Sequence, residues 1–229
     1  MSFKFRDRTQ AGRFLADKLE GRAGDPRTVV LALPRGGVPV AYEVAKRLSA
    51  PLDIFLVRKL GVPGQEELAM GAIASGDVCF LNEDIIDALS ISPETLEEII
   101  TQEKMELRRR ETAYRSQPAF PLRGRVVILV DDGLATGATM RAAVEAVREQ
   151  QPAGAIVAVP VAARDTYEQF HTVVDEIICV QTPKDFHGVG QWYEDFEQTT
   201  DEEVRDLLAR AADFRQPAPA AAGSSYFDI

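Results

Sequence analysis

The sequence predicts an α/β fold in which a doubly wound, mainly parallel sheet of five strands lies between helices. Five short apolar runs, rich in β-branched residues, recur along the chain and alternate with segments of helical periodicity. The runs are apolar throughout, which indicates strands that are covered on both faces. Alternation of this kind is typical of βαβ units in one parallel sheet. The predicted strands are TVVLAL (28–33), LDIFLVR (52–58), RVVILVDD (125–132), GAIVAVPVA (154–162) and VVDEIICV (173–180).

Helices are expected between these strands, at VPVAYEVAKRLS (38–49), GATMRAAVEAVREQ (137–150) and ARDTYEQFH (163–171). A long helix is predicted for residues 92–115, with Ser92 as its N-cap and Pro93 at its first position. Its arginines at 108–110 match the helix dipole at the carboxyl end, as solvated charges. The alternative is that one of Arg108, Arg109 and Arg110 reaches the phosphates of a ligand.

The length of 229 residues suits one domain with a sizeable core, and the composition is that of a globular protein. We expect a single domain over residues 1–215 and a flexible, low-complexity C-terminal tail over 216–229. Within the domain we expect a core at about 26–183, an inserted flexible loop and helix at about 60–123, and a small C-terminal hood at about 183–214, with a last helix from about 200.

Charge and composition limit the partners. The net charge of −10 argues against nucleic-acid binding but allows a local basic pocket for an anionic small molecule. No apolar run approaches the roughly 20 residues that cross a bilayer, and MSFKFRDRTQ lacks the apolar segment of a secretory signal. Cys79 and Cys179 lie in apolar, strand-like settings and are expected as buried free thiols in a reducing compartment. We therefore predict a cytoplasmic protein without membrane or nucleic-acid partners.

The stretch VVILVDDGLATGAT (126–139) carries the chemistry. Asp131 and Asp132 end a predicted strand, where open parallel sheets bind their ligands. Two buried carboxylates cost several kcal/mol unless ribose hydroxyls or a metal ion compensate them. The small residues that follow leave backbone N–H groups accessible ahead of a helix beginning near Gly137, which favours a phosphate. A capped turn would need only one aspartate, so the pattern predicts a site for ribose 5-phosphate.

This stretch resembles the signature of type I phosphoribosyltransferases, which bind phosphoribosyl diphosphate (PRPP) with magnesium. The resemblance extends over about residues 26–183 in strand count and order. It implies that Asp131 and Asp132 hold the ribose 2′- and 3′-hydroxyls. It also implies that the loop residues wrap the 5′-phosphate: Ala135, Thr136, Gly137, Ala138 and Thr139.

Two further stretches match this family in position and chemistry. LPRGGVP (33–39) corresponds to the loop that binds diphosphate, through the charge of Arg35 and the amides of Gly36 and Gly37. VRKLG (57–61) ends the second predicted strand, where Arg58 and Lys59 would neutralise the departing diphosphate. A glycine turn and solvated basic side chains are the structural alternatives.

The resemblance also implies a mobile loop and a hood. GVPGQEELAMGAI (61–73) would close over the site, with Gly61, Gly64 and Gly71 as hinges. In PKDFHGVGQWYEDF (183–196), aromatic side chains would stack a planar acceptor or only close a small core. The hood candidates are Phe186, Trp192 and Tyr193 for stacking, Lys184 for an exocyclic oxygen, and Asp195, weakly, for the metal diphosphate. Family analogy suggests a homodimer.

Ala135 departs from the family, because purine-using members often carry an acid there that exchanges a proton with the base. Either the acceptor needs no such transfer, or Glu66, Glu67, Asp195 or His187 supplies it, or the protein does not transfer at all. Gly133 also replaces a usual apolar residue, which would loosen the loop.

The main hypothesis is an enzyme that joins Mg²⁺–PRPP to a nitrogen acceptor, a nucleobase being expected, and releases diphosphate. The alternative is a PRPP-binding regulator. Mg²⁺ would arrive with the substrate, and the absence of His/Cys clusters from the sequence argues against zinc.

Overall fold

The computed structural model describes residues 3–114 and 119–214. Its main sheet has five strands, all parallel, in the order β2-β1-β6-β7-β8. The strands are β1 (Thr28–Ala32), β2 (Leu52–Ile54), β6 (Val126–Val130), β7 (Gly154–Val161) and β8 (Glu176–Gln181). This order confirms the predicted doubly wound α/β fold. The predicted tail, 216–229, lies outside the described residues.

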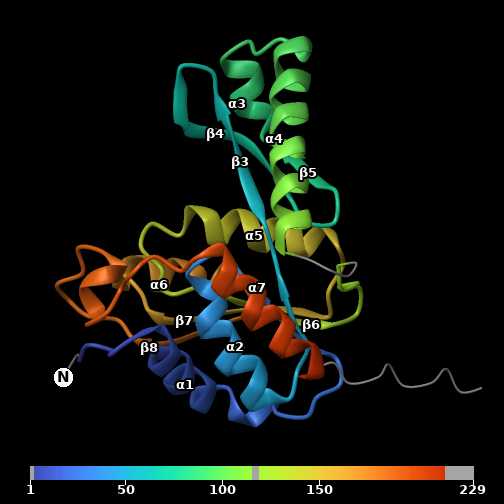
Figure 1. Ribbon diagram of the computed structural model, residues 1–229. Helices are drawn as coiled ribbons and strands as arrows, with labels where there is room; N and C mark the ends of the chain where they lie inside the picture. The colour runs from blue at the N-terminus through green and yellow to red at the C-terminus, as the bar shows by residue number, and fades with distance from the viewer. Residues whose placement is uncertain (1–2, 115–118, 215–229) are drawn as a thin grey trace, which may run out of the picture.

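Helices cover both faces of this sheet (Figure 1). Successive strand side chains point to opposite faces, so Val30 packs in one core cluster with Leu15 and Val38, while Val29 packs in the other with Val144. One face carries α1 (Arg8–Lys18), α2 (Gly37–Leu48) and α7 (Asp201–Arg210), and the other carries α5 (Ala138–Glu149) and α6 (Arg164–Phe170). Short 3-10 turns lie at Glu20–Arg22, Val189–Trp192 and Ala211–Phe214.

Helix α1 was not among the predicted elements. The Asp7 carboxylate caps it by accepting from the Gln10 N–H at 2.7 Å. Its buried residues include Ala11 and Leu15, four apart on one face. Gly12 lets α1 pack closely on α2, since a Cβ there would lie 2.7 Å from the Val40 carbonyl oxygen. Tertiary packing rather than a strong local pattern therefore supports this helix.

The region between β2 and β6 differs from the prediction. The expected strand 52–58 is two strands, because β2 ends at Ile54 and β3 begins at Val57. The expected mobile loop 61–73 is mostly strand β4, because Pro63–Gly64 forms a tight turn with Gly64 at φ +74°. Together β3 (Val57–Val62), β4 (Gln65–Ala74) and β5 (Val78–Leu81) form an antiparallel sheet, followed by α3 (Glu83–Ala88) and α4 (Pro93–Tyr114). We call residues 57–114 the arm, which projects from the main sheet in Figure 1.

Other local predictions had mixed outcomes. Helix α4 is confirmed, and the Ser92 hydroxyl accepts from the Thr95 N–H at 3.2 Å, as expected of an N-cap. The predicted burial of Cys79 is wrong, because β5 exposes alternate side chains at the edge of the arm, whereas Cys179 is half-buried. Among residues 3–114 and 119–214, no helix has the length and apolar composition needed to cross a bilayer.

Candidate functional site

The strand order places two candidate loops side by side. From β1 the chain crosses to β2 on one side, and from β6 it crosses to β7 on the other, so the carboxyl ends of β1 and β6 form the switch point at which such sheets bind ligands. The Leu33 N–H donates to the Val130 carbonyl oxygen at 2.9 Å and joins the two strand ends. The loop with Arg35 therefore lies against the loop with Asp131 and Asp132.

Glycine makes this contact close. A Cβ on Gly36 would lie 2.1 Å from Asp132 Oδ2, and a Cβ on Gly37 would lie 2.7 Å from the Val130 carbonyl oxygen. Neither glycine has a positive φ, so proximity rather than backbone conformation requires the missing side chain. The peptide bond between Pro34 and Arg35, in the same loop, is cis.

The acidic pair is half-buried and linked by hydrogen bonds. The Asp132 N–H donates to Asp131 Oδ1 at 2.8 Å, and Arg8 Nε donates to Asp132 Oδ2 at 2.8 Å. Burial, and then the charge of Asp132, raises the pKa of Asp131 well above its ordinary value. Burial also raises the pKa of Asp132, while the Arg8 guanidinium opposes this rise. A ligand that donates hydrogen bonds would stabilise both carboxylates.

The loop after the acidic pair is anchored to the protein through its backbone. The Leu134 N–H donates to the Val161 carbonyl at 2.9 Å, and Thr166 Oγ1 donates to the Ala135 carbonyl at 2.6 Å. Gly137 has a φ of +77° and precedes the first residue of α5. The loop residues Ala135, Thr136, Ala138 and Thr139 are exposed at the start of this helix. Such a helix start with accessible small residues is suited to a phosphate.

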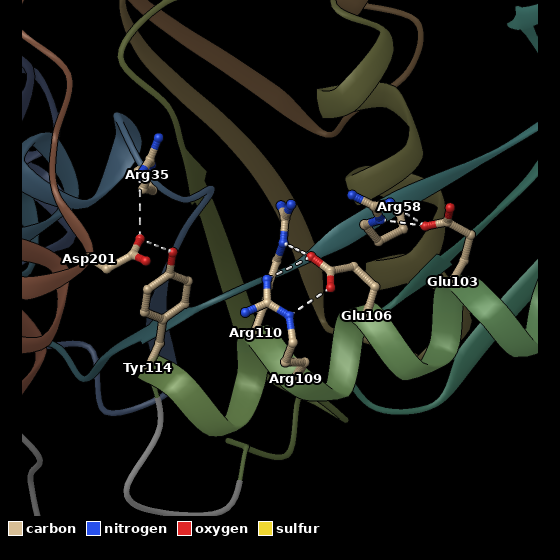
Figure 2. A network of polar contacts seen from close by, with 8 residues as sticks. All are labelled: Arg35, Arg58, Glu103, Glu106, Arg109, Arg110, Tyr114 and Asp201. Carbon is tan, nitrogen blue, oxygen red and sulfur yellow. Dashed lines mark hydrogen bonds and ion pairs between the residues drawn. The ribbon is translucent and has the colours of Figure 1, made fainter.

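Arg35 reaches toward two other elements. Its Nη1 lies 3.4 Å from Asp201 Oδ1 at the start of α7, and the Tyr114 hydroxyl at the end of α4 donates to the same oxygen at 2.6 Å, as Figure 2 shows. Both charged side chains are substantially exposed, so the ion pair contributes little stability. A diphosphate could therefore compete for Arg35 at small cost.

Arg58 and Lys59 belong to the arm and not, as predicted, to the end of the second core strand. Neighbouring side chains of a strand point to opposite faces. Arg58 pairs with Glu103 of α4 at 2.5 Å (Figure 2). Lys59 instead lines a groove of about 830 Å³ between the arm and α5, together with Thr139. The structure thus brings Lys59, but not Arg58, beside the predicted phosphate loop.

The hood contains an aromatic cluster. The Tyr193 ring is only 3% exposed and packs on Phe5 with a centroid distance of 5.5 Å. Its hydroxyl donates to the Asp132 carbonyl oxygen at 2.6 Å. Phe186 and Trp192 are half-buried at the edge of the same cluster. Tyr193 therefore packs in a small core beneath the acidic pair and has little ring surface left to stack an acceptor.

Two hood residues predicted for ligand contacts are exposed, Lys184 and Asp195. Asp195 Oδ1 accepts from the Glu197 N–H at 3.0 Å. Within the part of the chain that the structure describes, no group of three or more His, Cys, Asp and Glu side chains is arranged to hold a metal ion.

Comparison with known proteins agrees with this geometry. The family model described as "Phosphoribosyl transferase domain" matches residues 6–197, which span both loops and the hood up to Glu197. The chain belongs to this phosphoribosyltransferase family. The crystal structure of the protein TT1426 from Thermus thermophilus is similar over 91% of this chain and 99% of that one, with a TM-score of 0.80 and 41% identity.

Two Mycobacterium tuberculosis proteins are also similar, named "Putative phosphoribosyl transferase MT0597" and "Putative phosphoribosyl transferase Rv0571c". Each is 45% identical over 208 residues, which cover 90% of this chain and 47% of the relative. The chain thus spans about half the length of these two relatives.

The arginines near the end of α4 form ion pairs with side chains of the protein, which favours their interpretation as solvated charges. Arg109 and Arg110 both pair with Glu106, each at 2.7 Å (Figure 2), and Arg108 lies 3.5 Å from Asp77. The pairs of Arg109 and Arg110 are thus local to α4, whereas the exposed pair of Arg108 reaches the turn between β4 and β5.

Arg8 is the site residue that the sequence analysis missed. It contacts Asp132 across 124 residues of sequence, and no motif or spacing distinguishes it from the other basic residues of the chain.

Gly133 has a packing role, rather than the loosening predicted for it. A Cβ at this position would lie 2.5 Å from Cγ1 of Val189 in the hood. We expect Gly133→Ala to lower the free energy of unfolding by about 1–3 kcal/mol through overpacking. Val189→Ala in the same chain should restore part of the loss, as measured by urea denaturation of the single and double variants. Additive losses would show that the two residues do not press on one another.

Proposed function

We propose that this protein transfers the 5-phosphoribosyl group from Mg²⁺–PRPP to a nitrogen acceptor, a nucleobase being the expected class, and releases diphosphate. The observation that carries the proposal is the contact between the Gly36–Gly37 loop and the Asp131–Asp132 pair at the switch point of the sheet. The bond that would break joins C1′ of the ribose to the diphosphate, so a ribose site next to a diphosphate site would hold both sides of that bond.

The protein's contribution is positioning and electrostatic stabilisation. Asp131 and Asp132 would accept hydrogen bonds from the ribose hydroxyls, and the loop 135–139 would hold the 5′-phosphate at the start of α5. Arg35 and Lys59 would stabilise the negative charge of the departing diphosphate. Cleavage of the C1′–oxygen bond leaves a cation-like sugar, and the acceptor nitrogen attacks the opposite face of C1′.

The residues fit magnesium only as an ion carried by its substrate. The acidic pair and Asp195 supply carboxylate oxygens, which suit Mg²⁺, but no three-carboxylate cluster is formed by the described side chains. When bound with PRPP, the ion would neutralise diphosphate charge. Arg58 stays a weaker candidate for the same task, because Glu103 holds its guanidinium.

Among the hood residues we assign the acceptor to Phe186, Trp192 and Lys184, and we leave Tyr193 to packing. Loss of a stacking ring typically weakens a bound base by roughly 1–3 kcal/mol. We therefore expect Trp192→Ala to raise the KM of the acceptor about tenfold or more, with a smaller effect on the KM of PRPP. Initial-rate kinetics with each substrate varied in turn would measure this. Equal loss for both substrates would indicate that Trp192 only packs.

The test of the function is ³¹P NMR of the protein with Mg²⁺ and PRPP, scanned against pooled purines, pyrimidines and small aromatic amines. Diphosphate that appears with one pool alone would establish transfer and name the acceptor class. PRPP resonances that broaden with every pool but never convert would instead establish the PRPP-binding regulator, which Ala135 favours because it cannot exchange a proton. Unaltered resonances would contradict both functions.

The wider setting is also proposed. We expect a cytoplasmic protein of one domain over residues 1–215 that binds small molecules and no nucleic acid, and that forms a homodimer. Size-exclusion chromatography with light scattering would give the mass of the protein in solution and so test the homodimer.

A further inference from the structure

Arg8 lies outside the three predicted loops, yet its side chain reaches the acidic pair. It is the first residue of α1, and its Nε donates to Asp132 Oδ2 at 2.8 Å. The Arg8 side chain is 12% exposed and that of Asp132 is 15% exposed. Both ions are therefore largely removed from water. Loss of either would leave the other as a buried charge without its main charged partner, which is strongly destabilising. This distinguishes the pair from the exposed ion pairs elsewhere on the protein.

The same guanidinium also holds the hood. Its Nη1 donates to the Glu197 carbonyl oxygen at 2.6 Å, and its central carbon lies 3.9 Å from the centroid of the Phe196 ring. A planar guanidinium can bind a carboxylate, a carbonyl and an aromatic face together, whereas an ammonium group has no comparable fork or plane. Arg8 therefore links three segments that are far apart in the sequence.

Backbone hydrogen bonds also join the segment before α1 to the hood. The Phe5 N–H donates to the Trp192 carbonyl at 2.8 Å, and the Glu194 N–H donates to the Phe5 carbonyl at 2.7 Å. Tyr193, between these two hood residues, donates its hydroxyl to the Asp132 carbonyl. The hood thus contacts the backbone of Asp132 through Tyr193, and the carboxylate of Asp132 through Arg8.

We infer that Arg8 is a positioning residue that joins the ribose-binding carboxylate of Asp132 to the hood. The inference rests on the proposed function for the role of Asp132. Arg8 fixes the rotamer of Asp132 by engaging Oδ2, and this assigns Oδ1 to a ribose hydroxyl. It also sets the distance between the ribose site and the hood residues 192–197, so one side chain aligns the two substrates' sites.

The experiment compares three variants of the full chain, Arg8→Gln, Arg8→Lys and Arg13→Gln. Arg13 is the matched control, because it lies on the same helix and pairs with Glu43 at 3.2 Å, with a mostly exposed side chain. Calorimetry with PRPP and Mg²⁺ measures the ribose site. Acrylamide quenching of Trp192, the one tryptophan of the sequence, measures the hood without any ligand.

Arg8→Gln should weaken PRPP binding about 30-fold or more, because Arg8 no longer holds the Asp132 carboxylate in place and a displacement of about 1 Å can cost about 100-fold. It should also raise the quenching of Trp192, while Arg13→Gln changes neither. Arg8→Lys keeps the charge but not the planar fork, so it should recover much of the PRPP affinity while the quenching stays raised. A merely structural role of Arg8 would not separate the two measurements in this way.

Two outcomes would overturn the inference: wild-type affinity and quenching in Arg8→Gln, or equal losses in Arg13→Gln, which would indicate general loosening of α1. If Arg8→Gln fails to fold, Arg8→Lys tests the inference: PRPP affinity near that of the wild type with raised quenching of Trp192 supports it, and wild-type quenching contradicts it. If the wild-type protein binds no PRPP, the proposed function fails, and unchanged quenching in Arg8→Gln would reject the link to the hood as well.

Discussion

Replacing Asp131 and Asp132 together by asparagine is expected to lower PRPP affinity at least about 100-fold while the fold persists. Each carboxylate would lose a charge-assisted hydrogen bond to a ribose hydroxyl, and such bonds contribute about 1.5–3 kcal/mol. Asparagine has nearly the same shape, and its oxygen can still accept from the Asp132 N–H and from Arg8. Calorimetry with PRPP and Mg²⁺ measures the loss, and circular dichroism checks the fold.

Asp131→Asn alone should raise stability at neutral pH. Burial first, and the charge of Asp132 second, raises the pKa of Asp131 in the folded protein. A carboxyl with a raised folded pKa destabilises the fold as pH rises above its unfolded pKa of about 3.9. Asparagine carries no such penalty, so we expect a gain of about 0.5–2 kcal/mol at pH 7 that shrinks as the pH falls.

Urea denaturation of Asp131→Asn and of the wild-type protein between pH 4 and 8 would measure this gain. If the carboxylates serve ligand binding at the expense of stability, replacing them by asparagine should lower the PRPP affinity, and replacing Asp131 should raise the free energy of unfolding. Unchanged PRPP affinity in the double variant would reject the assignment of the ribose site. A lower free energy of unfolding in Asp131→Asn would instead mean that groups of the protein already stabilise the charged Asp131 carboxylate without a ligand.

The main sheet was predictable because its strands are buried on both faces and therefore read as continuous apolar runs. The same signal failed between β2 and β3. Phe55 and Leu56 link these strands and are themselves buried, so the apolar run continues where the backbone pairing passes from β1 to the arm: the Phe55 N–H donates to the Ala32 carbonyl, whereas the Leu56 carbonyl accepts from the Ser75 N–H. The arm was missed for a related reason, since glycines in 61–73 suggested a loop, although Gly71 lies in a strand where a Cβ would meet the Phe80 carbonyl at 2.4 Å.

The loops of the site were predictable because each contains its chemistry within a few consecutive residues. The contacts that orient them were not. Tyr193 and Arg8 reach Asp132 across 61 and 124 residues of sequence, and neither contact leaves a local pattern. Likewise, only the fold separates Arg58 from Lys59, because alternation along β3 turns one toward α4 and the other toward the phosphate loop.

Gly36→Ala is expected to weaken PRPP binding on the order of 100-fold, as displacement of a site group by about 1 Å can do. The new Cβ would lie 2.1 Å from Asp132 Oδ2, so that carboxylate must shift, and the shift would disturb its 2.8 Å hydrogen bond from Arg8 Nε. The backbone of Gly36 is already helical, with φ −60°, so alanine adds no conformational strain there. The loss should therefore appear in PRPP affinity more than in the free energy of unfolding.

Gly37→Ala provides the contrast, and Gly21→Ala the control. At Gly37 the new Cβ would meet backbone, the Val130 carbonyl oxygen at 2.7 Å, which cannot turn aside as a carboxylate can. We expect that variant to lose about 1–3 kcal/mol of stability. A Cβ at Gly21 meets nothing within 4 Å and should change neither property. If Gly36→Ala binds PRPP normally, Asp132 can shift without loss, and its orientation by Arg8 would not matter for the ribose.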